Sequence, residues 1–119
     1  MARVLIVEDS DLMRNILRDK TKEAGHEVVG EIADGSQVEK AIIQNKPQII
    51  LLDIILPGII GLDLLSVIQS NFPDIKVIVI SQLEDQRIIQ EALERGAVEF
   101  ITKPVDNKLD HLLGKLAVL

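Results

Sequence analysis

Short apolar runs of strand length alternate with amphipathic segments of helical length along the chain, and this alternation most constrains its fold. The runs are rich in Val, Ile and Leu, and several are apolar at every position. Continuous apolarity is typical of strands that are covered on both faces in a parallel sheet. The sequence predicts five strands, at residues 4–7, 28–32, 49–52, 77–80 and 98–102.

The intervening segments carry helix signals. Ser36 and Glu39 fit a capping box that starts the second helix, and Pro47 ends it. Gly25 and Gly96 are stop signals for the first and fourth helices, of which the fourth spans about residues 85–95. The apolar stripes are Leu12, Met13, Ile16, Leu17 and Ala24 in the first helix, Val38, Ala41 and Ile42 in the second, Leu62, Leu65, Ile68 and Phe72 in the third, and Leu109, Leu112, Leu113 and Leu116 in the fifth, which begins near Asn107.

Five βα units of this kind predict one α/β domain over residues 1–119, with a doubly wound parallel sheet, right-handed crossovers and helices on both faces. The chain is too short for a barrel of eight such units. In an open sheet of this type, ligands bind beyond the carboxyl ends of the strands.

Composition excludes several functions. With 13 basic and 19 acidic residues the net charge is −6, which argues against direct nucleic-acid binding. The aromatic residues are only Phe72 and Phe100, too few for a base-stacking platform. Cysteine is absent, which rules out disulfides and thiolate sites, and no apolar run is long enough to insert into a membrane. We expect a cytoplasmic protein.

Chemically active side chains follow four of the predicted strands. They are Glu8 and Asp9 after the first, Asp53 after the third, Ser81 after the fourth and Lys103 after the fifth. Carboxylates about 5 Å apart repel by roughly 3 kcal/mol per pair at an effective dielectric constant of about 20, so a cation is expected among them. Oxygen ligands favour Mg²⁺. Lys103 and Ser81 equip the same edge to receive a phosphoryl group.

Each residue also has a plain structural explanation. Asp9 with Ser10 could cap the first helix, Ser81 could cap the approach to the fourth, and Lys103 could be a solvated loop residue. Their joint placement at one sheet edge favours a functional site.

These residues belong to ordered motifs. The motifs are Glu8-Asp9-Ser10, Asp53 followed by Pro57-Gly58 and Gly61-Leu62, Ser81, and Phe100-Ile101-Thr102-Lys103-Pro104. Together they resemble the receiver domain of two-component response regulators. Residues 8–14 are similar in particular to CheY-like single-domain members, which favours a chemotaxis role. The resemblance implies a flavodoxin-like fold with strand order 2-1-3-4-5.

The resemblance also implies roles. Asp53 is expected to take a phosphoryl group from a phosphohistidine of a sensor histidine kinase or phosphotransfer protein, while Glu8, Asp9, Asp53 and the backbone carbonyl of Ile55 hold Mg²⁺. Lys103 would pair with the acyl phosphate. On phosphorylation, Ser81 would move to hydrogen-bond a phosphoryl oxygen, and Phe100 would turn inward into the space that Ser81 leaves. These two movements would change the face made by the fourth helix, fifth strand and fifth helix. The bond before Pro104 is expected to be cis.

Several residues depart from the family pattern. Ile59 and Ile60 make the loop after Asp53 unusually apolar, which suits a packing partner. Gln82 is large for its position and could cover the site. Ile55 and Leu83 have no hydrogen-bonding side chain to orient water, so we expect slow self-dephosphorylation. Phe100 replaces a common Tyr, so switching there would work by packing alone.

Two other functions each need a feature that the sequence lacks. An aspartyl-phosphate hydrolase of the haloacid dehalogenase type needs a second acid two residues after the nucleophile, where Ile55 stands. A flavodoxin-like cofactor carrier needs a phosphate-binding loop rich in glycine or hydroxyl groups after the first strand, where this chain has an acidic loop. A receiver-like module that is never phosphorylated remains the rival. We expect output by protein contact, from a monomer or weak homodimer. The kinase and the target are not identified by the sequence, and a longer regulator would contain the same domain.

Overall fold

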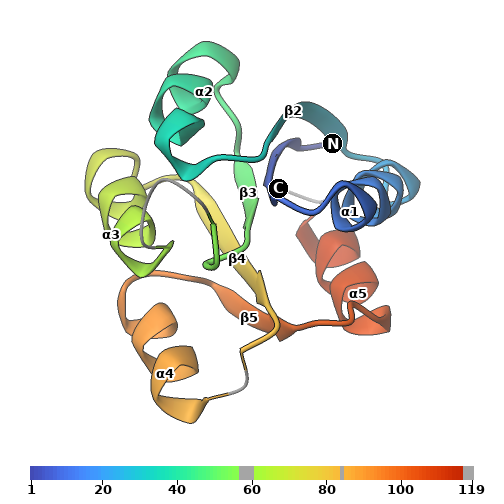
Figure 1. The fold of residues 1–119 in the computed structure, drawn as a ribbon. Helices are drawn as coiled ribbons and strands as arrows, with labels where there is room; N and C mark the ends of the chain where they lie inside the picture. The colour runs from blue at the N-terminus through green and yellow to red at the C-terminus, as the bar shows by residue number, and fades with distance from the viewer. Residues whose placement is uncertain (57–60, 84, 117–119) are drawn as a thin grey trace.

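A computed structural model describes residues 1–56, 61–83 and 85–116. Five parallel strands form one sheet in the order β2-β1-β3-β4-β5 (Figure 1). Their bounds are β1 Arg3–Val7, β2 Glu27–Ile32, β3 Ile49–Leu52, β4 Lys76–Ser81 and β5 Glu99–Thr102. The expected fold class and strand order are thus confirmed, with strand ends that differ from expectation by one residue at most.

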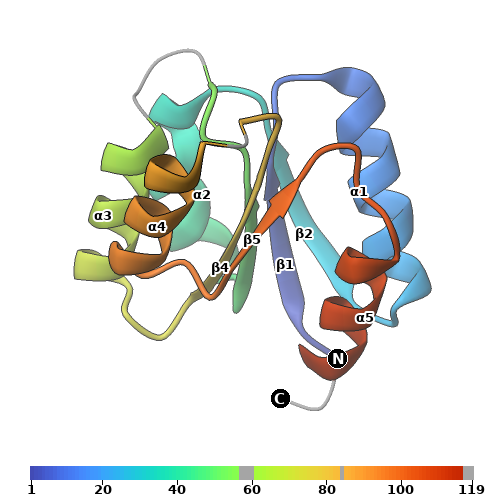
Figure 2. The ribbon, with the colours of Figure 1, turned by 90° about the horizontal axis from the view of Figure 1, so that it is seen from below.

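Helices cover both faces of the sheet. Figure 2 shows α1 and α5 on one face and α2, α3 and α4 on the other. The helices are α1 Asp11–Glu23, α2 Val38–Asn45, α3 Gly61–Asn71, α4 Gln86–Glu94 and α5 Asn107–Leu116, with a 3₁₀ turn, η1 Gly35–Gln37, before α2. Gly25 and Gly96 adopt positive φ angles of 86° and 112°, which confirms them as the stops of α1 and α4. No helix in this part of the chain combines the length and apolar character that a membrane span requires.

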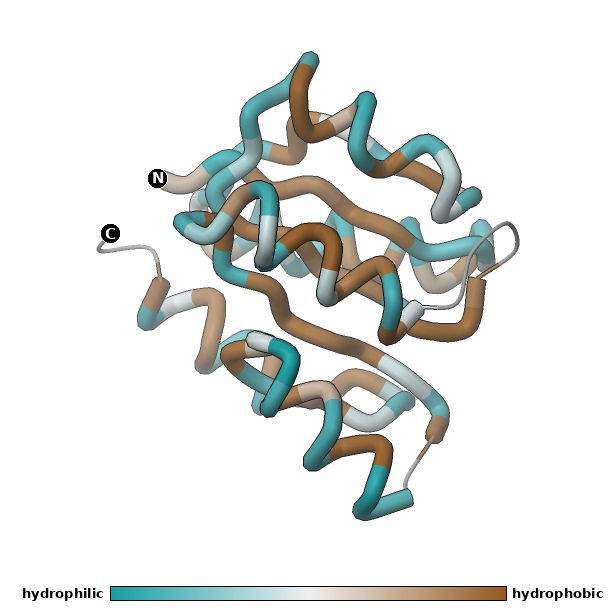
Figure 3. Tube along the Cα trace, turned by 90° about the vertical axis from the view of Figure 1, so that its left-hand side faces the viewer, coloured by the Kyte–Doolittle hydropathy of each residue, from teal (hydrophilic) through white to brown (hydrophobic). Residues whose placement is uncertain are grey.

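The core has two layers, one on each face of the sheet. Alternate strand residues point to opposite faces, so Leu5 and Val7 pack toward α2, α3 and α4, while Val4 and Ile6 pack toward α1 and α5. Figure 3 shows the strands as mostly hydrophobic and the helices as alternating in hydropathy. This two-sided burial explains the continuous apolar runs, and the parallel direction of the strands places their carboxyl ends at one edge.

Two sequence expectations are wrong. Ser36 does not cap α2, because the Asp34 carboxylate accepts the Ser36 N–H at 2.8 Å and starts the 3₁₀ turn instead. Leu12 was expected in the buried stripe of α1 but is 72% exposed. It lies in the first turn of that helix. The cap of α1 is Ser10, whose Oγ accepts the Met13 N–H at 3.2 Å.

Candidate functional site

Three charged residues meet at the carboxyl edge of the sheet. β1 and β3 end side by side, with Val7 opposite Leu52, so Glu8 and Asp53 leave the sheet together. Lys103 follows β5, and its Nζ lies 2.9 Å from Asp53 Oδ2 and 2.6 Å from Glu8 Oε1. All three side chains are at least nine-tenths buried. Two carboxylates therefore share one ammonium group away from bulk solvent.

Glu8 is held in the turn between β1 and α1. Its Oε2 accepts the Ser10 N–H at 3.1 Å. Its Oε1 contacts the Lys103 ammonium outside hydrogen-bond geometry and has no hydrogen-bond donor among the described residues. The negative charge of this buried atom is therefore balanced by an ion pair with Lys103.

Burial and the neighbouring charges shift the pKa values of Glu8 and Lys103. Burial raises the pKa of the Glu8 carboxyl above its ordinary 4.5, although Lys103 acts in the opposite direction. Burial also lowers the pKa of Lys103, but its interactions with Glu8 and Asp53 outweigh this, and the pKa ends above its ordinary 10.5. Lys103 is therefore a fixed positive charge at neutral pH.

Asp9 completes a group of three carboxylates. Glu8, Asp9 and Asp53 each place a carboxylate oxygen within 4.8 Å of the others. Asp9 is exposed and opens the group to solvent. The site occupies a pocket of about 220 Å³, large enough for a cation that keeps some of its water. Three carboxylates gathered around one ammonium group form an all-oxygen donor set that fits Mg²⁺.

Ser81 and Phe100, the expected switch residues, are not among the residues that line this pocket. Ser81 ends β4 and is fully buried, and its Oγ accepts the Leu83 N–H at 3.2 Å. Phe100 is only 5% exposed and already points inward, within the core layer under α2, α3 and α4. The peptide bond between Lys103 and Pro104 is cis, as expected.

Two of the residues that depart from the family pattern, Ile55 and Gln82, line the pocket. Ile55 lines the pocket and is 50% exposed, and its N–H donates to Asp53 Oδ1 at 2.9 Å. Gln82 also lines the pocket and is exposed. Ile59 and Ile60, with Pro57 and Gly58, fall outside the described residues.

Comparisons with known proteins agree with this geometry. The family model for the response regulator receiver domain matches residues 4–116. This chain belongs to that family. It is 39% identical to the chemotaxis protein CheY of Thermotoga maritima over 102 residues, which are 86% of this chain and 85% of that protein.

The receiver domain is also similar to part of a longer protein. It is 40% identical to a protein-glutamate methylesterase/protein-glutamine glutaminase of Thermotoga maritima, matching 86% of this chain but 30% of that protein. The crystal structure of the response regulator domain of Thermotoga maritima CheB matches with a TM-score of 0.80 and 35% identity, covering 98% of this chain and 90% of that one.

Membership has general consequences. Receiver domains are phosphorylation-dependent signalling switches of two-component systems rather than classical enzymes. They work with histidine kinases or phosphotransfer proteins and with downstream targets, and they generally bind Mg²⁺ at an acidic pocket such as the one formed here by Glu8, Asp9 and Asp53.

Sequence reasoning missed the role of one basic residue on α1 of this receiver domain. From the sequence alone, the basic residues of α1 could form either a docking face for an acidic kinase partner or a solvated helix face. They are Arg14, Arg18, Lys20 and Lys22. In the structure, Arg14 donates from Nη1 to the Glu8 carbonyl at 2.8 Å, Arg18 pairs with Glu31 and Lys20 pairs with Asp110. The only signal for Arg14 in the sequence is its place one helical turn after the Ser10 cap.

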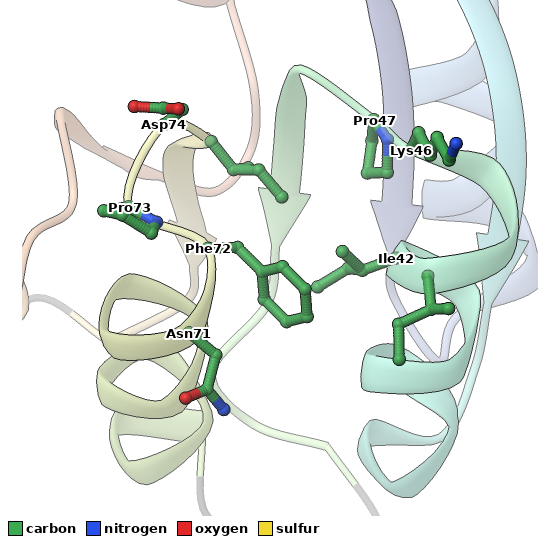
Figure 4. Close-up of a pocket in the computed structure, with 9 residues that line it drawn as sticks. Ile42, Lys46, Pro47, Asn71, Phe72, Pro73 and Asp74 are labelled. Atoms are coloured by element: carbon green, nitrogen blue, oxygen red, sulfur yellow. The ribbon is translucent and has the colours of Figure 1, made fainter.

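A second, larger cleft of about 500 Å³ lies at the opposite edge of the receiver domain, between the ends of α2 and α3. Figure 4 shows the Phe72 ring projecting between the two helices, with Ile42 on the other side. Its lining is mainly apolar and contains none of the residues of the acidic pocket. The lining residues are Ile42, Ile43, Lys46, Pro47, Asn71, Phe72, Pro73, Asp74 and Ile75.

Proposed function

We propose that this receiver domain is a signalling switch whose phosphoacceptor is Asp53. The supporting observation is the position of Asp53: it is nearly buried, lies 2.9 Å from the Lys103 ammonium, and shares a pocket with two further carboxylates. The donor is a phosphohistidine on a sensor histidine kinase or phosphotransfer protein. Catalysis by this chain is limited to accepting the phosphoryl group and slowly hydrolysing the product.

Each residue of the pocket has a separate task in the proposed transfer. A carboxylate oxygen of Asp53 forms a bond to phosphorus as the phosphorus–nitrogen bond of the donor breaks, and the released imidazole nitrogen takes up a proton from solvent. Glu8, Asp9, Asp53 and the Ile55 carbonyl would hold Mg²⁺, which supplies charge neutralisation for the transferring group when bound. Lys103 stays protonated and pairs with the phosphoryl oxygens.

The proposed output is a change of the face formed by α4, β5 and α5. Ser81 would donate its hydroxyl hydrogen to a phosphoryl oxygen, a donor that its acceptance of the Leu83 N–H leaves available. Phe100 would respond by repacking in the adjoining core layer. The resulting surface binds a downstream protein, in a cytoplasmic and chemotaxis-type pathway, with the domain acting as a monomer or weak homodimer.

Intact mass tests the proposal directly. The native protein and Asp53→Asn are incubated with acetyl phosphate, with and without Mg²⁺. A single phosphoryl adduct that requires both Mg²⁺ and Asp53 is the expected result. No adduct from acetyl phosphate or from a phosphohistidine donor would contradict the proposal and leave the rival function, an unphosphorylated interaction module.

A further inference from the structure

Arg14 connects α1 to the turn that carries two of the acidic side chains. Its Nη1 donates to the Glu8 backbone carbonyl at 2.8 Å, and its side chain is 19% exposed. It also pairs with the exposed carboxylate of Asp11. The guanidinium therefore lies between solvent and the inner side of the turn between β1 and α1.

The Glu8 carbonyl needs this donor because the sheet ends just before it. The last paired residues of β1 and β2 are Val7 and Ile32, and the Glu8 N–H still donates to the Ile32 carbonyl at 2.9 Å. Among the residues that the structure describes, no backbone N–H beyond Ile32 donates to the Glu8 carbonyl. The Arg14 guanidinium supplies the donor instead. A charge-assisted hydrogen bond thus continues the strand pairing by one residue.

Fixing the Glu8 backbone also fixes the directions of the neighbouring side chains. The Glu8 N–H and carbonyl are both held, and the carboxylate is held in turn by the Ser10 N–H. We infer that Arg14 is a positioning residue for the cation site, because it holds the backbone from which Glu8 and Asp9 project. This inference rests on the proposed function, which assigns a cation to those carboxylates.

Calorimetric titration of the full chain with Mg²⁺ tests the inference without measuring phosphorylation. Arg14→Met keeps most of the aliphatic stem and removes the donor, whereas Arg14→Lys keeps one donor. Arg18→Met is the matched control, since Arg18 lies one turn further along α1 and pairs with Glu31 instead. Losing a hydrogen bond behind a metal ligand costs about ten-fold or more in metal affinity. We expect that loss in Arg14→Met, substantial recovery in Arg14→Lys and no change in Arg18→Met.

The outcomes separate the inference from the proposed function. A native chain that does not bind Mg²⁺ overturns the cation site, and the inference with it. Native Mg²⁺ affinity in Arg14→Met, or an equal loss in Arg14→Met and Arg14→Lys, overturns only the role of Arg14. Unfolding midpoints in EDTA show whether each variant is folded, and if Arg14→Met is not, Arg14→Leu, which also has no donor, is titrated in its place with the same criteria.

Discussion

The Lys103 ammonium lies 2.6 Å from Glu8 Oε1, and both side chains are almost completely removed from solvent. Asp53 shares the same ammonium, so one positive charge faces two buried negative charges. The cost of burying Glu8 is reflected in its raised pKa. In the absence of a cation, this edge of the sheet is therefore a source of instability.

Neutralising Glu8 should stabilise the metal-free protein. Glu8→Gln keeps an oxygen that can accept the Ser10 N–H and leaves Lys103 paired with Asp53. We expect the free energy of unfolding at pH 7 in EDTA to rise by about 1 kcal/mol. Urea denaturation measures this difference.

The difference in unfolding free energy between Glu8→Gln and the native protein should depend on pH. Because the pKa of Glu8 in the folded state is raised above 4.5, the folded chain binds this proton more tightly than the unfolded chain. The stabilisation from Glu8 is complete below the unfolded pKa and is lost as the pH rises through the folded one. The advantage of Glu8→Gln should therefore shrink as the pH falls from 7 toward 4.5. A constant difference, or a destabilised variant, contradicts this. Asp9→Asn, at an exposed position, is the control.

The phosphorylated form should decay slowly. Ile55 lines the pocket and has no group that can orient an attacking water. We expect Ile55→Asn to shorten the lifetime several-fold, as followed by a radiolabel chase after the donor is removed. Ile43→Asn, which changes an exposed residue of the other cleft, should leave the lifetime unchanged. Decay of the native form within seconds would be inconsistent with this explanation.

Gly61 and Gly114 should respond in opposite ways to a single added methyl group. A Cβ at Gly61 would overlap the backbone of Ile54, next to Asp53, whereas a Cβ at Gly114 meets nothing within 4 Å. We expect Gly61→Ala to cost about 2–3 kcal/mol of unfolding free energy. Gly114→Ala, within α5, should add about 0.5–1 kcal/mol. Chemical denaturation of both variants checks the contrast, and equal effects would refute it.

His26 joins three separate parts of the chain. Its Nδ1 accepts the Ala2 N–H at 3.0 Å, and its Nε2 donates to the Leu113 carbonyl of α5 at 2.8 Å. His26→Ala leaves both buried groups unpaired, and we expect it to cost about 2–4 kcal/mol of unfolding free energy. His111→Ala, at an exposed position, should change stability by less than about 0.5 kcal/mol. A small effect at His26 would show that water replaces its ring.

The sequence predicted the sheet and the members of the acidic pocket well, because apolar runs covered on both faces are distinctive and because parallel strands bring their carboxyl ends to one edge. It did not predict features set by competing local contacts. The Asp34 carboxylate accepts the Ser36 N–H, so the helical segment begins with a 3₁₀ turn rather than with a cap at Ser36. Leu12, in the first turn of α1, is exposed although its spacing fits the buried stripe. The contact from Arg14 to Glu8 depends on where strand pairing stops, which no residue pattern shows.

The core contains aliphatic side chains almost throughout, and its two aromatic residues, Phe72 and Phe100, both pack on the side of α2, α3 and α4. With no Tyr or Trp in the chain, the protein is nearly invisible in near-ultraviolet absorption and has no tryptophan fluorescence. A single Trp placed at either Phe would therefore be the sole emitter in the molecule. At position 72 its emission would report on the apolar cleft, and at position 100, within β5, on the core layer under α2, α3 and α4. Changes in the cleft and in the core could therefore be followed separately by fluorescence.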